Sequence, residues 1–588
     1  MDKVIVDNKW TYPLADKEVE KTVEKLSKET GLSKEEVIIF YNRRIRTAKE
    51  IKRFINLGMK DLLDPRGLKD IEKVSEAIIR HGKAGNLIVL YSDYDADGCF
   101  SVVVFLKLLR ALGFNVEYFT NDRDLGYGIQ EKGADLLLEK FPDVKLIVTA
   151  DNGIVAIDAI KYVVEELKIE VCVTDHHEPL PSGIIPNCTG VVNPKRFDDT
   201  YPFKGLCGTA VIYKLCRLIY EDIGMDPRKC DEMLDFVAIA TVADVMPLLE
   251  ENRVFVKEGL NIINREDKNI WKYMKEVLMN PMYETSVNSK TIGFTYGPAV
   301  NACSRLLGNM DIPLKAFLLD DSNPANENDI KHTIKHMQSI NEERKELSNN
   351  QTVGTMNVVE EFIDDPIYVV WHEELHEGIV GIIAGRICEK FNKPTIIMTR
   401  SKDDPSIWKG SGRSVEGFNI KEVLDEIQDE TGLINKYGGH EGACGLSIEE
   451  KNLNSFKIEI LLKADELISN NPKTTVIDLA LKDEEYSIEI YDRMKALEPF
   501  GQDFPEPVYG IREFSPKFSE SFGGDEKIKH VKFTGENIIF VGWNCGEDWI
   551  EDGKPNKDIS VIGELGYNDY SKKMQLTTRS YTDIYFDK

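Results

Sequence analysis

Short apolar runs alternate with amphipathic stretches between about residues 60 and 250 of this 588-residue chain. Five of the runs have the length and composition of buried strands. They are Leu87–Tyr91, Val116–Thr120, Leu146–Ala150, Val171–Thr174 and Phe236–Thr241. Stretches of helical length, such as Val102–Leu109 and Ile157–Leu167, separate them. Strands that alternate with helices predict a parallel sheet with right-handed crossovers, and therefore an α/β fold.

Polar turns rich in Asp and His follow four of these runs. The turns are Asp93–Gly98 (DYDADG), Asp151–Gly153 (DNG), Asp175–Glu178 (DHHE) and Asp244 with its neighbours. Open α/β sheets bind ligands at the carboxyl ends of their strands, so we expect these side chains to meet at one edge. Crowded carboxylates repel one another unless a cation holds them, and hard oxygen ligands suit magnesium or manganese. The pattern therefore predicts a divalent-metal site.

Each turn has a simpler interpretation when it is taken alone. Asp is common in turns and helix caps, and the DxDxDG pattern also opens a calcium loop. The calcium loop requires a Glu six residues after the Gly, whereas Gly98 is followed by Ser101 and an apolar helix. Only nine His occur in the chain, and two are adjacent at the end of one predicted strand. Four such turns together favour a metal or phosphate site over four unrelated caps.

The remaining segments predict further domains. Residues 1–60 are mostly charged with helical spacing, and we interpret the basic run Asn42–Arg46 as a solvated helix face. The segment Asn326–Val359 carries one apolar stripe and predicts a long connecting helix. Residues 365–470 repeat the strand and helix pattern, and the last 110 or so residues hold short β-rich pieces typical of a small barrel. The expected domains are 1–60, 61–262, 263–364, 365–472 and 473–588.

The composition argues against several functional classes. A net charge of −27 disfavours a protein that coats nucleic acid generally, although it leaves room for a locally basic groove. The ten Cys form no CxxC pair, which indicates reduced thiols in the cytoplasm. The start of the chain has no signal-peptide pattern, and no apolar run approaches the ~20 residues of a membrane span. We therefore expect a cytoplasmic protein.

Metal-assisted hydrolysis is the chemistry that these residues suit best. Two divalent ions about 3.5–4 Å apart can activate a water, neutralise a phosphate and stabilise the leaving oxygen. Such a site needs several carboxylates and a neutral imidazole, which the four turns supply. The chain has no GxSxG elbow and no P-loop, which argues against a serine hydrolase and against nucleotide-driven motion.

At these motifs the chain resembles the DHH phosphoesterase superfamily. The matching segments are DYDADG (Asp93–Gly98), TADNG (Thr149–Gly153), DHH (Asp175–His177) and ATVADVMPL (Ala240–Leu248). Four further segments resemble the RecJ-type single-strand exonucleases: GPAVNACSR (Gly297–Arg305), WKGSGRSVEGFN (Trp408–Asn419), GGHEGACG (Gly438–Gly445) and LEPFGQDFPEP (Leu497–Pro507). The resemblance covers about residues 60–510, and the ordered set is far more specific than the DHH tripeptide alone.

The resemblance implies a two-metal site, with Mn²⁺ or Mg²⁺ as the ions. The implied metal ligands, which are also the catalytic residues together with His177, are Asp95, Asp97, Asp151, His176 and Asp244. Asp151 is expected to bridge both ions, and His177 to face the scissile phosphate. Asp93 and Asp175 are expected to shape turns or to support the ligands. Tyr91 stands where several relatives in the wider superfamily carry His, which implies that one ion is held loosely and binds with the substrate.

The resemblance also implies where the substrate binds. The implied anchors of a 5′ phosphate are Arg123, Arg305, Ser411 and Arg413. Tyr127 is expected to stack on a base, and His440 to lie near the scissile group. We expect Arg413 in a Ser-Gly-Arg-Ser turn. The C-terminal domain is expected to be an OB fold that contacts a single strand through a basic stripe. The stripe consists of Lys527, Lys529, His530 and Lys532.

The expected fold is thus α/β: a parallel-sheet DHH domain and a smaller DHHA1 domain, joined by a long helix and followed by an OB-like β-barrel. The resemblance implies a metal-dependent exonuclease that degrades single-stranded DNA from a 5′ end in DNA repair or recombination. Two alternatives stay open: an enzyme that cleaves short oligoribonucleotides or small phosphoesters, and a catalytically silent replication scaffold. We expect a monomer that binds single-stranded DNA and no membrane. A single-strand-binding protein and a helicase are candidate protein partners.

Overall fold

The computed structural model describes residues 10–280, 286–321, 323–402, 404–467, 475–523, 530–551, 559–568, 571–578 and 584–586. The chain divides into two compact units. One unit contains Leu63–Met246 and Phe255–Asn470, and the other contains Met1–Leu62, Pro247–Val254 and Asn471–Lys588. Among the described residues, no helix combines the length and the apolar character that a membrane span requires.

The first α/β domain is built on a parallel sheet of five strands in the order β3-β2-β4-β5-β6. The strands are β2 (Leu87–Ser92), β3 (Val116–Thr120), β4 (Val144–Ala150), β5 (Glu170–Thr174) and β6 (Gly190–Val192). The first four confirm the strands that the apolar runs predict. The fifth, β6, has three residues, too few for an apolar run to reveal it.

The apolar run Phe236–Thr241 is a helix, so the prediction of a strand there is wrong. It forms most of α9 (Leu234–Ala243), in which the eight residues from Leu234 to Thr241 are all buried. A helix that is buried all round has no polar face, so its sequence lacks the 3.6-residue period that distinguishes helices from strands. Asp244 lies three residues after the run and ends the helix as its C-cap.

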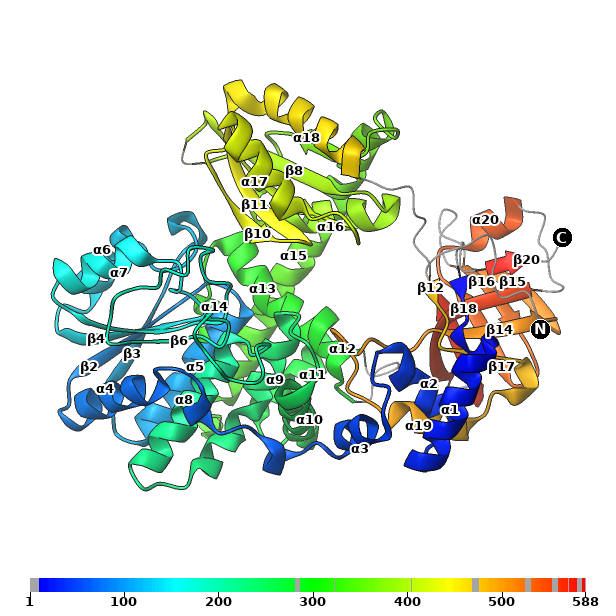
Figure 1. Ribbon diagram of the computed structural model, residues 1–588, viewed down its shortest axis with the longest axis horizontal. Helices are drawn as coiled ribbons and strands as arrows, with labels where there is room; N and C mark the ends of the chain where they lie inside the picture. Colours follow the sequence, from blue (N-terminus) through cyan, green and yellow to red (C-terminus); the bar gives the residue numbers. More distant parts are fainter. Residues whose placement is uncertain are drawn as a thin grey trace. The chain divides into compact units, whose positions relative to one another are not determined.

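Helices cover both faces of the sheet (Figure 1). Helices α6 and α7 lie on one face, and α4, α5 and α8 lie on the other. Their bounds are α4 (Ile71–Lys83), α5 (Ala96–Ala111), α6 (Glu131–Lys140), α7 (Ile157–Glu165) and α8 (Gly208–Asp222). Because each crossover returns the chain to the start of the next parallel strand, the turns after β2, β4 and β5 share one edge of the sheet.

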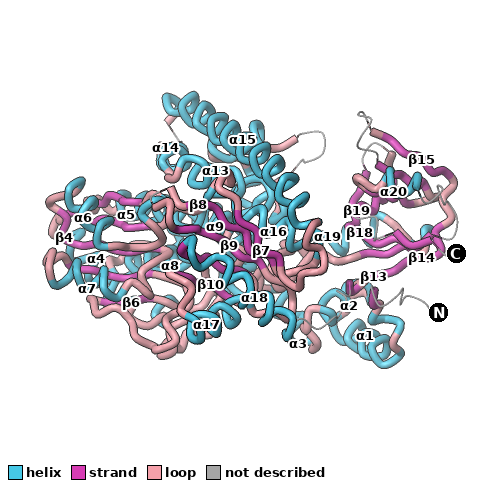
Figure 2. The backbone as a smooth tube through the Cα atoms, turned by 90° about the horizontal axis from the view of Figure 1, so that it is seen from above, coloured by secondary structure: helices cyan, strands magenta, loops and turns pink. Residues whose placement is uncertain are grey.

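A helical segment follows the sheet and ends in a connecting helix of 34 residues, α15 (Glu327–Glu360). Its other members are α10 (Glu250–Arg265), α11 (Asn269–Leu278), α12 (Ser289–Thr291), the π-helical turn η6 (Ile292–Tyr296), α13 (Gly297–Leu307) and α14 (Asp311–Leu318). Figure 2 shows α15 beside α13 and α14. The buried apolar side chains of α15 include Ile330, Ile334 and Met337, as the apolar stripe predicts. The predicted connecting helix is confirmed.

The second α/β domain has a mixed sheet in the order β10-β11-β9-β8-β7, in which only β7 and β8 are parallel. The strands are β7 (Tyr368–Trp371), β8 (Thr395–Arg400), β9 (Ile407–Arg413), β10 (Lys436–His440) and β11 (Ala443–Glu449). Helix α16 (Val380–Phe391) packs on one face of the sheet. Helices α17 (Ile420–Thr431) and α18 (Leu453–Leu467) pack on the other.

Ser411 and Arg413 lie in β9, so the predicted turn at Arg413 is wrong. Strand β9 pairs with β8 on one side and β11 on the other. Its glycines allow close packing, because a Cβ atom on Gly412 would lie only 2.5 Å from Cys444 Sγ. A glycine-rich stretch that is typical of a turn therefore serves here as a central strand.

The other unit joins the first helices of the chain to the C-terminal sheet. Its helices are α1 (Lys17–Thr30), α2 (Lys34–Asn42), α3 (Ala48–Asn56), α19 (Ile488–Lys495) and α20 (Gly546–Glu551). A short parallel pair links β1 (Trp10–Thr11) to β12 (Thr475–Val476). One hydrophobic core contains Val37 and Phe40 of α2 together with Phe504, Ile511 and Val561 of the C-terminal segment. The two ends of the chain therefore fold as one unit.

The C-terminal sheet is mixed and has the order β13-β14-β18-β19-β17-β16-β15, with β20 paired to β18. Its strands are β13 (Leu479–Leu481), β14 (Tyr509–Phe514), β15 (Phe518–Phe522), β16 (His530–Thr534), β17 (Ile538–Gly542), β18 (Ile559–Asn568), β19 (Lys573–Thr578) and β20 (Ile584–Phe586). Of the predicted basic stripe, His530 and Lys532 lie on β16, and Lys532 pairs with Glu520. Lys527 and Lys529 lie outside the described residues.

The basic run Asn42–Arg46 is only partly a solvated helix face. The Arg43 guanidinium lies 2.9 Å from Asp478, and both side chains are at most 6% exposed. Arg43 also donates hydrogen bonds to the carbonyl oxygens of Ile39 and Pro505. The prediction is therefore wrong for Arg43, whose ion pair connects α2 to the C-terminal segment.

Candidate metal centre and phosphate site

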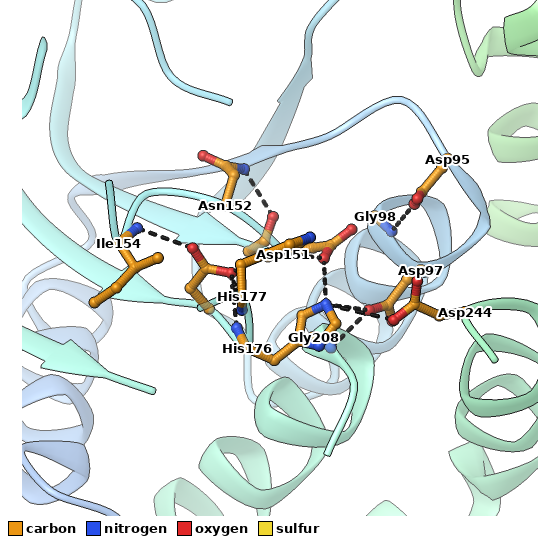
Figure 3. A network of polar contacts seen from close by, with 12 residues as sticks. Asp95, Asp97, Gly98, Asp151, Asn152, Ile154, His176, His177, Gly208 and Asp244 are labelled. Atoms are coloured by element: carbon orange, nitrogen blue, oxygen red, sulfur yellow. Dashed lines mark hydrogen bonds and ion pairs between the residues drawn. The ribbon is translucent and has the colours of Figure 1, made fainter. Parts of the chain in front are cut away.

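The predicted metal ligands come together at the carboxyl edge of the parallel sheet (Figure 3). His176, which follows β5, lies at the centre of the group. Its Nε2 atom lies 2.9 Å from Asp151 Oδ1, 3.5 Å from Asp244 Oδ2 and 3.6 Å from Asp97 Oδ2. Three carboxylates from three separate segments thus surround one imidazole nitrogen.

Backbone N–H groups hold Asp97 in place. The carboxylate of Asp97 accepts hydrogen bonds from Gly208 N at 2.6 Å and from Thr209 N at 2.8 Å. Both donors belong to the first turn of α8, where N–H groups have no partner within the helix. The partial positive charge at this helix end also favours a carboxylate. The start of α8 therefore orients one side of the cluster before any ligand binds.

Asp151 lies in a turn that its neighbours fix. Its backbone has φ = +61°, a left-handed conformation that is uncommon for a residue other than Gly. The Asn152 side chain bonds the carbonyl oxygens of Ala150 and Tyr91 and the N–H of Ile129, and so holds the turn against the sheet. This unusual backbone at the end of β4 directs the Asp151 carboxylate to His176.

Two sets of three side chains are arranged closely enough to hold an ion. One consists of Asp151, His176 and His177, and the other of Asp97, His176 and Asp244. Within each set, the candidate ligand atoms lie within 4.8 Å of one another. Asp95 belongs to neither set; its carboxylate accepts a hydrogen bond from Gly98 N and caps α5, and it also interacts with the Asp151 side chain. Figure 3 shows Asp95 to the side of the cluster.

The electrostatics of this cluster fit a bound cation. Burial and the charge of Asp95 raise the pKa of Asp93 to about 8. Burial and neighbouring carboxylates also raise the pKa values of Asp95, Asp151 and Asp244. The buried atoms His176 Nδ1 and Asp244 Oδ2 have no hydrogen-bond partner. Buried carboxylates that repel one another, together with a neutral imidazole, are a ligand set that a divalent ion stabilises.

Asp175 organises the two adjacent histidines. Its carboxylate accepts hydrogen bonds from the N–H groups of Ile154, His176 and His177, and from His177 Nδ1 at 2.8 Å. Burial raises the pKa of Asp175, but the charge and hydrogen bonding of His177 outweigh it and lower that pKa to about 2. Burial lowers the pKa of His177, but Asp175 outweighs it and raises that pKa to about 9. Burial and the charge of His177 lower the pKa of His176 to about 4.

The pKa values of these two neighbouring histidines therefore lie on opposite sides of neutral pH. The neutral His176 suits a metal ligand, because a metal binds imidazole only in its unprotonated form. The positively charged His177 is 41% exposed and suits an anion such as a phosphate. The difference has two causes: Asp175 contacts the His177 ring and raises its pKa, whereas burial and the charge of His177 lower the pKa of His176.

Tyr127 lies next to the cluster, on the Gly-rich loop after β3. Its hydroxyl donates to the Asp151 carbonyl at 2.9 Å and lies 2.8 Å from His177 Nδ1. The Tyr127 and His177 rings meet edge to face, with centroids 5.2 Å apart. Because 40% of Tyr127 is exposed, the ring is accessible beside the candidate metal ligands.

Three of the predicted phosphate anchors belong to a group of arginines that lacks acidic partners. The Arg123 guanidinium lies over the Tyr94 ring at 4.8 Å, and Arg305 donates to the Gly378 carbonyl at 3.2 Å. Arg413 donates to Ser411 Oγ at 2.9 Å and to the Gly412 carbonyl. Among the described residues, no carboxylate forms an ion pair with any of these three arginines. Such a group of cations suits a bound phosphate.

Ser411 and Arg413 lie against the first turn of α16. A Cβ atom on Gly381, in that turn, would lie 3.0 Å from Ser411 Oγ and 3.1 Å from Arg413 Nη2. The glycine therefore leaves room for both side chains at a helix end whose N–H groups favour anions. Burial, together with the nearby charges of Arg123, Arg344 and Arg413, lowers the pKa of Arg305 to about 10. The group thus includes Arg344, which sequence reasoning missed.

His440 is separate from these contacts. It ends β10 in the β10–β11 hairpin, is exposed, and accepts a hydrogen bond from Gly442 N through Nδ1. Among the described residues, no polar contact joins it to the metal ligands or to the arginines. Its predicted place near the scissile group stays a prediction.

Together, a parallel sheet with buried carboxylates and imidazole at its carboxyl edge, and a second domain with arginines, are the arrangement of a protein of the DHH class. Family models match three regions of the chain. These are the DHH family, N-terminal domain (residues 87–241), the DHHA1 domain (364–467) and the RecJ OB domain (477–580). The chain belongs to the RecJ family.

Curated relatives are similar in sequence to most of the chain. Single-stranded-DNA-specific exonuclease RecJ of Bacillus subtilis (strain 168) is 30% identical over 549 residues, which is 92% of this chain and 66% of the relative. The chain therefore spans slightly less than two thirds of that protein. RecJ of Haemophilus influenzae (strain Rd) is 30% identical over 516 residues, which is 85% of this chain and 84% of the relative.

Solved structures support the fold, and with it the predicted DHH, DHHA1 and OB-like architecture. The structure of RecJ in complex with Mn²⁺ from Thermus thermophilus superposes with a TM-score of 0.78 at 23% identity. The match covers 99% of this chain and 80% of the RecJ chain. A structure of exonuclease RecJ bound to manganese covers 69% of this chain and 97% of its own, with a TM-score of 0.56 at 27% identity.

Proposed function

We propose that this protein is a metal-dependent exonuclease that degrades single-stranded DNA in the 5′-to-3′ direction. The observation that carries the proposal is the cluster around His176, which lies in the same compact unit as the arginine group that lacks acidic partners. The cluster suits metal-assisted hydrolysis, and the arginines suit the phosphates of a substrate. The RecJ relatives are named as exonucleases specific for single-stranded DNA.

The residues that would hold Mn²⁺ or Mg²⁺ are Asp95, Asp97, Asp151, His176 and Asp244. A pair of such ions activates a water and stabilises the leaving oxygen of a phosphodiester. The chain contributes the orientation of the ligands, because the α8 amides hold Asp97 and the Asn152 side chain holds the Asp151 turn. His177 contributes a positive charge at the exposed side of the cluster, where it would contact the scissile phosphate.

The direction of degradation would come from recognition of a terminal phosphate. Arg123, Arg305, Ser411 and Arg413 would anchor the 5′ phosphate at the first turn of α16. Tyr127 would stack on the terminal base, since its exposed ring lies beside the cluster. His440 would approach the scissile group from the β10–β11 hairpin. A strand held at its 5′ end in this way would present the adjacent phosphodiester to the metal ligands.

The two alternative functions have less support. An enzyme for small phosphoesters or short oligoribonucleotides needs no OB domain, whereas residues 477–580 match the RecJ OB model. A silent scaffold needs no metal ligands, whereas every expected ligand is present here. A role in DNA repair or recombination, in the cytoplasm, follows from the proposed activity. The free cysteines, most of them buried, support a reducing compartment. We also propose that the protein is a monomer and that it binds a single-strand-binding protein or a helicase.

A gel assay of end-labelled strands tests the proposal. Purified protein is incubated with Mn²⁺, Mg²⁺ or EDTA and with single-stranded DNA labelled at either end. A 5′ label should appear at once as mononucleotide, a 3′ label should appear in progressively shorter strands, and EDTA should stop both. Matched duplex and RNA strands serve as controls. Equal cleavage of duplex, or release of mononucleotide first from the 3′ label, would contradict the proposal.

A further inference from the structure

A cavity beside the candidate metal ligands is lined by Arg344, the one member of the arginine group to which the proposed function assigns no contact. The cavity has a volume of about 210 Å³, and its lining includes Ala243, Asn301, Arg305 and Arg344. Ala243 precedes the candidate ligand Asp244. Asn301 Oδ1 accepts a hydrogen bond from Ala96 N at 2.8 Å, between Asp95 and Asp97. The cavity therefore adjoins the backbone that carries three of the candidate ligands.

Arg344 is a buried cation of the connecting helix. It lies on α15, one turn after Ile340 on the buried stripe, and is only 8% exposed. Its Nε and Nη2 atoms both donate to Asn341 Oδ1, at 3.1 Å and 2.8 Å. One neutral oxygen thus accepts from two donors, and among the described residues no carboxylate pairs with Arg344. Asn341 fixes the plane of the guanidinium but leaves its charge unneutralised.

The surroundings of Arg344 add positive charge. Arg305 lines the same cavity and also has no acidic partner among the residues that the structure describes. Arg386, on α16, is close enough for its charge to disfavour the charged form of Arg344, and donates to Asn349 at 2.7 Å. A buried guanidinium without a counter-charge is costly. An anion that enters the cavity would offset the cost of burying these two positive charges.

We propose that Arg344 binds a phosphate of the substrate strand in this cavity. The inference rests on the proposed function and adds to it a contact from the connecting helix. A guanidinium whose plane is fixed can donate two parallel hydrogen bonds to a phosphate. Arg305 would contact the same strand from α13. The phosphate is either the terminal 5′ phosphate or an internal one, and the two sources can be separated by experiment.

The test compares Arg344→Gln with Lys345→Gln. Lys345 is the next residue of α15 and is exposed, so its replacement removes one positive charge from the same helix outside the cavity. Binding of fluorescent oligothymidylates, with a 5′ phosphate or a 5′ hydroxyl, is measured by anisotropy in EDTA so that no strand is cleaved. Arg344→Gln should weaken binding about 10- to 100-fold, as for a lost hydrogen bond between charged groups, and Lys345→Gln should change it little.

The two oligonucleotides identify the source of the phosphate. A loss confined to the 5′-phosphorylated strand assigns the terminal phosphate, and an equal loss on both strands assigns an internal one; either result supports the inference. Unchanged affinity for both strands overturns it. Because binding is measured without turnover, that result would leave the exonuclease activity of the wild type, assayed separately, standing.

A second variant covers the case in which Arg344→Gln does not fold. Arg344→Lys keeps the charge but loses the planar fork, and it should bind with intermediate affinity. Thermal unfolding of each variant identifies those that fold. If Arg344→Lys is folded and binds like the wild type, Arg344 acts only within the protein and the inference fails.

Discussion

At the scale of single residues, chemistry depends on which side chains are buried together. The residue types and spacing predict a metal site, and the structure places Asp97, Asp151 and Asp244 around His176. The different pKa values of His176 and His177 could not be predicted, because they depend on burial and on which ring Asp175 contacts. Arg344 was missed for a similar reason: one Arg among many charges gives no sign that it is buried.

Replacing Asp151 with Asn should abolish hydrolysis while the protein stays folded. Asn keeps the shape of the side chain but removes the charge that a divalent ion needs. We expect a loss beyond the roughly 10- to 100-fold that follows from changing residues behind metal ligands. Initial rates on labelled single strands at saturating Mn²⁺ measure the effect. Asp158→Asn, at an exposed position of α7, is the control, and near-normal rates in Asp151→Asn would remove Asp151 from the ligands.

Replacing Arg413 with Ala should selectively reduce the use of 5′-phosphorylated ends. Arg413 lies with Ser411 at the first turn of α16, where a terminal phosphate would accept from its guanidinium. The ratio of kcat/KM for 5′-phosphate and 5′-hydroxyl strands should fall at least about 10-fold, the size of one charged hydrogen bond. Arg400→Ala, which removes an arginine paired with Glu450, is the control. Equal losses on both ends would assign Arg413 a structural role.

At the scale of elements, the length of an apolar run and the spacing of its apolar residues determine which helices and strands the sequence predicts. Strands β2, β4 and β5 follow from short apolar runs, and α15 follows from its single stripe of apolar residues. Helix α9 was mistaken for a strand because burial on every side removes its period. Strand β9 was mistaken for a turn because its glycines serve close packing between strands. In both cases the neighbours of the element, and not its own residues, decide its structure.

Gly208 begins α8 and its N–H binds the Asp97 carboxylate, so Gly208→Ala should impair activity. A Cβ atom there would lie 2.8 Å from Asp151 Cβ and 3.1 Å from Asp97 Oδ2. The start of α8 would have to shift, and its amides would release Asp97. We expect weaker activation by Mn²⁺, measured as a higher half-saturating metal concentration. Gly354→Ala is a matched control, because nothing lies within 4 Å of its Cβ position in α15. That change should stabilise the helix by about 1 kcal/mol.

At the scale of the whole molecule, no local sequence pattern predicts that the first helices pack against the C-terminal sheet. Trp10 pairs with Thr475 across more than 460 residues, and helices α1–α3 share a core with the C-terminal sheet. Local periodicity predicts each element but not which distant element will cover its apolar face. The domain boundaries predicted from composition therefore treat the two ends as separate, although they form one compact unit.

The buried ion pair of this unit gives the last prediction. Arg43→Met should lower the free energy of unfolding of this unit by about 3–5 kcal/mol, because Asp478 would remain buried without its partner. Arg46→Met is the matched control, since Arg46 is exposed and its guanidinium lies over the Tyr41 ring. Its replacement should cost no more than about 1 kcal/mol.

Hydrogen exchange read by mass spectrometry can assign the effect to a unit. Exchange should increase in α1–α3 and the C-terminal sheet but not in β2, β4 and β5. Equal effects of the two substitutions, or faster exchange in the parallel sheet as well, would show that the ion pair does not specifically join the two chain ends.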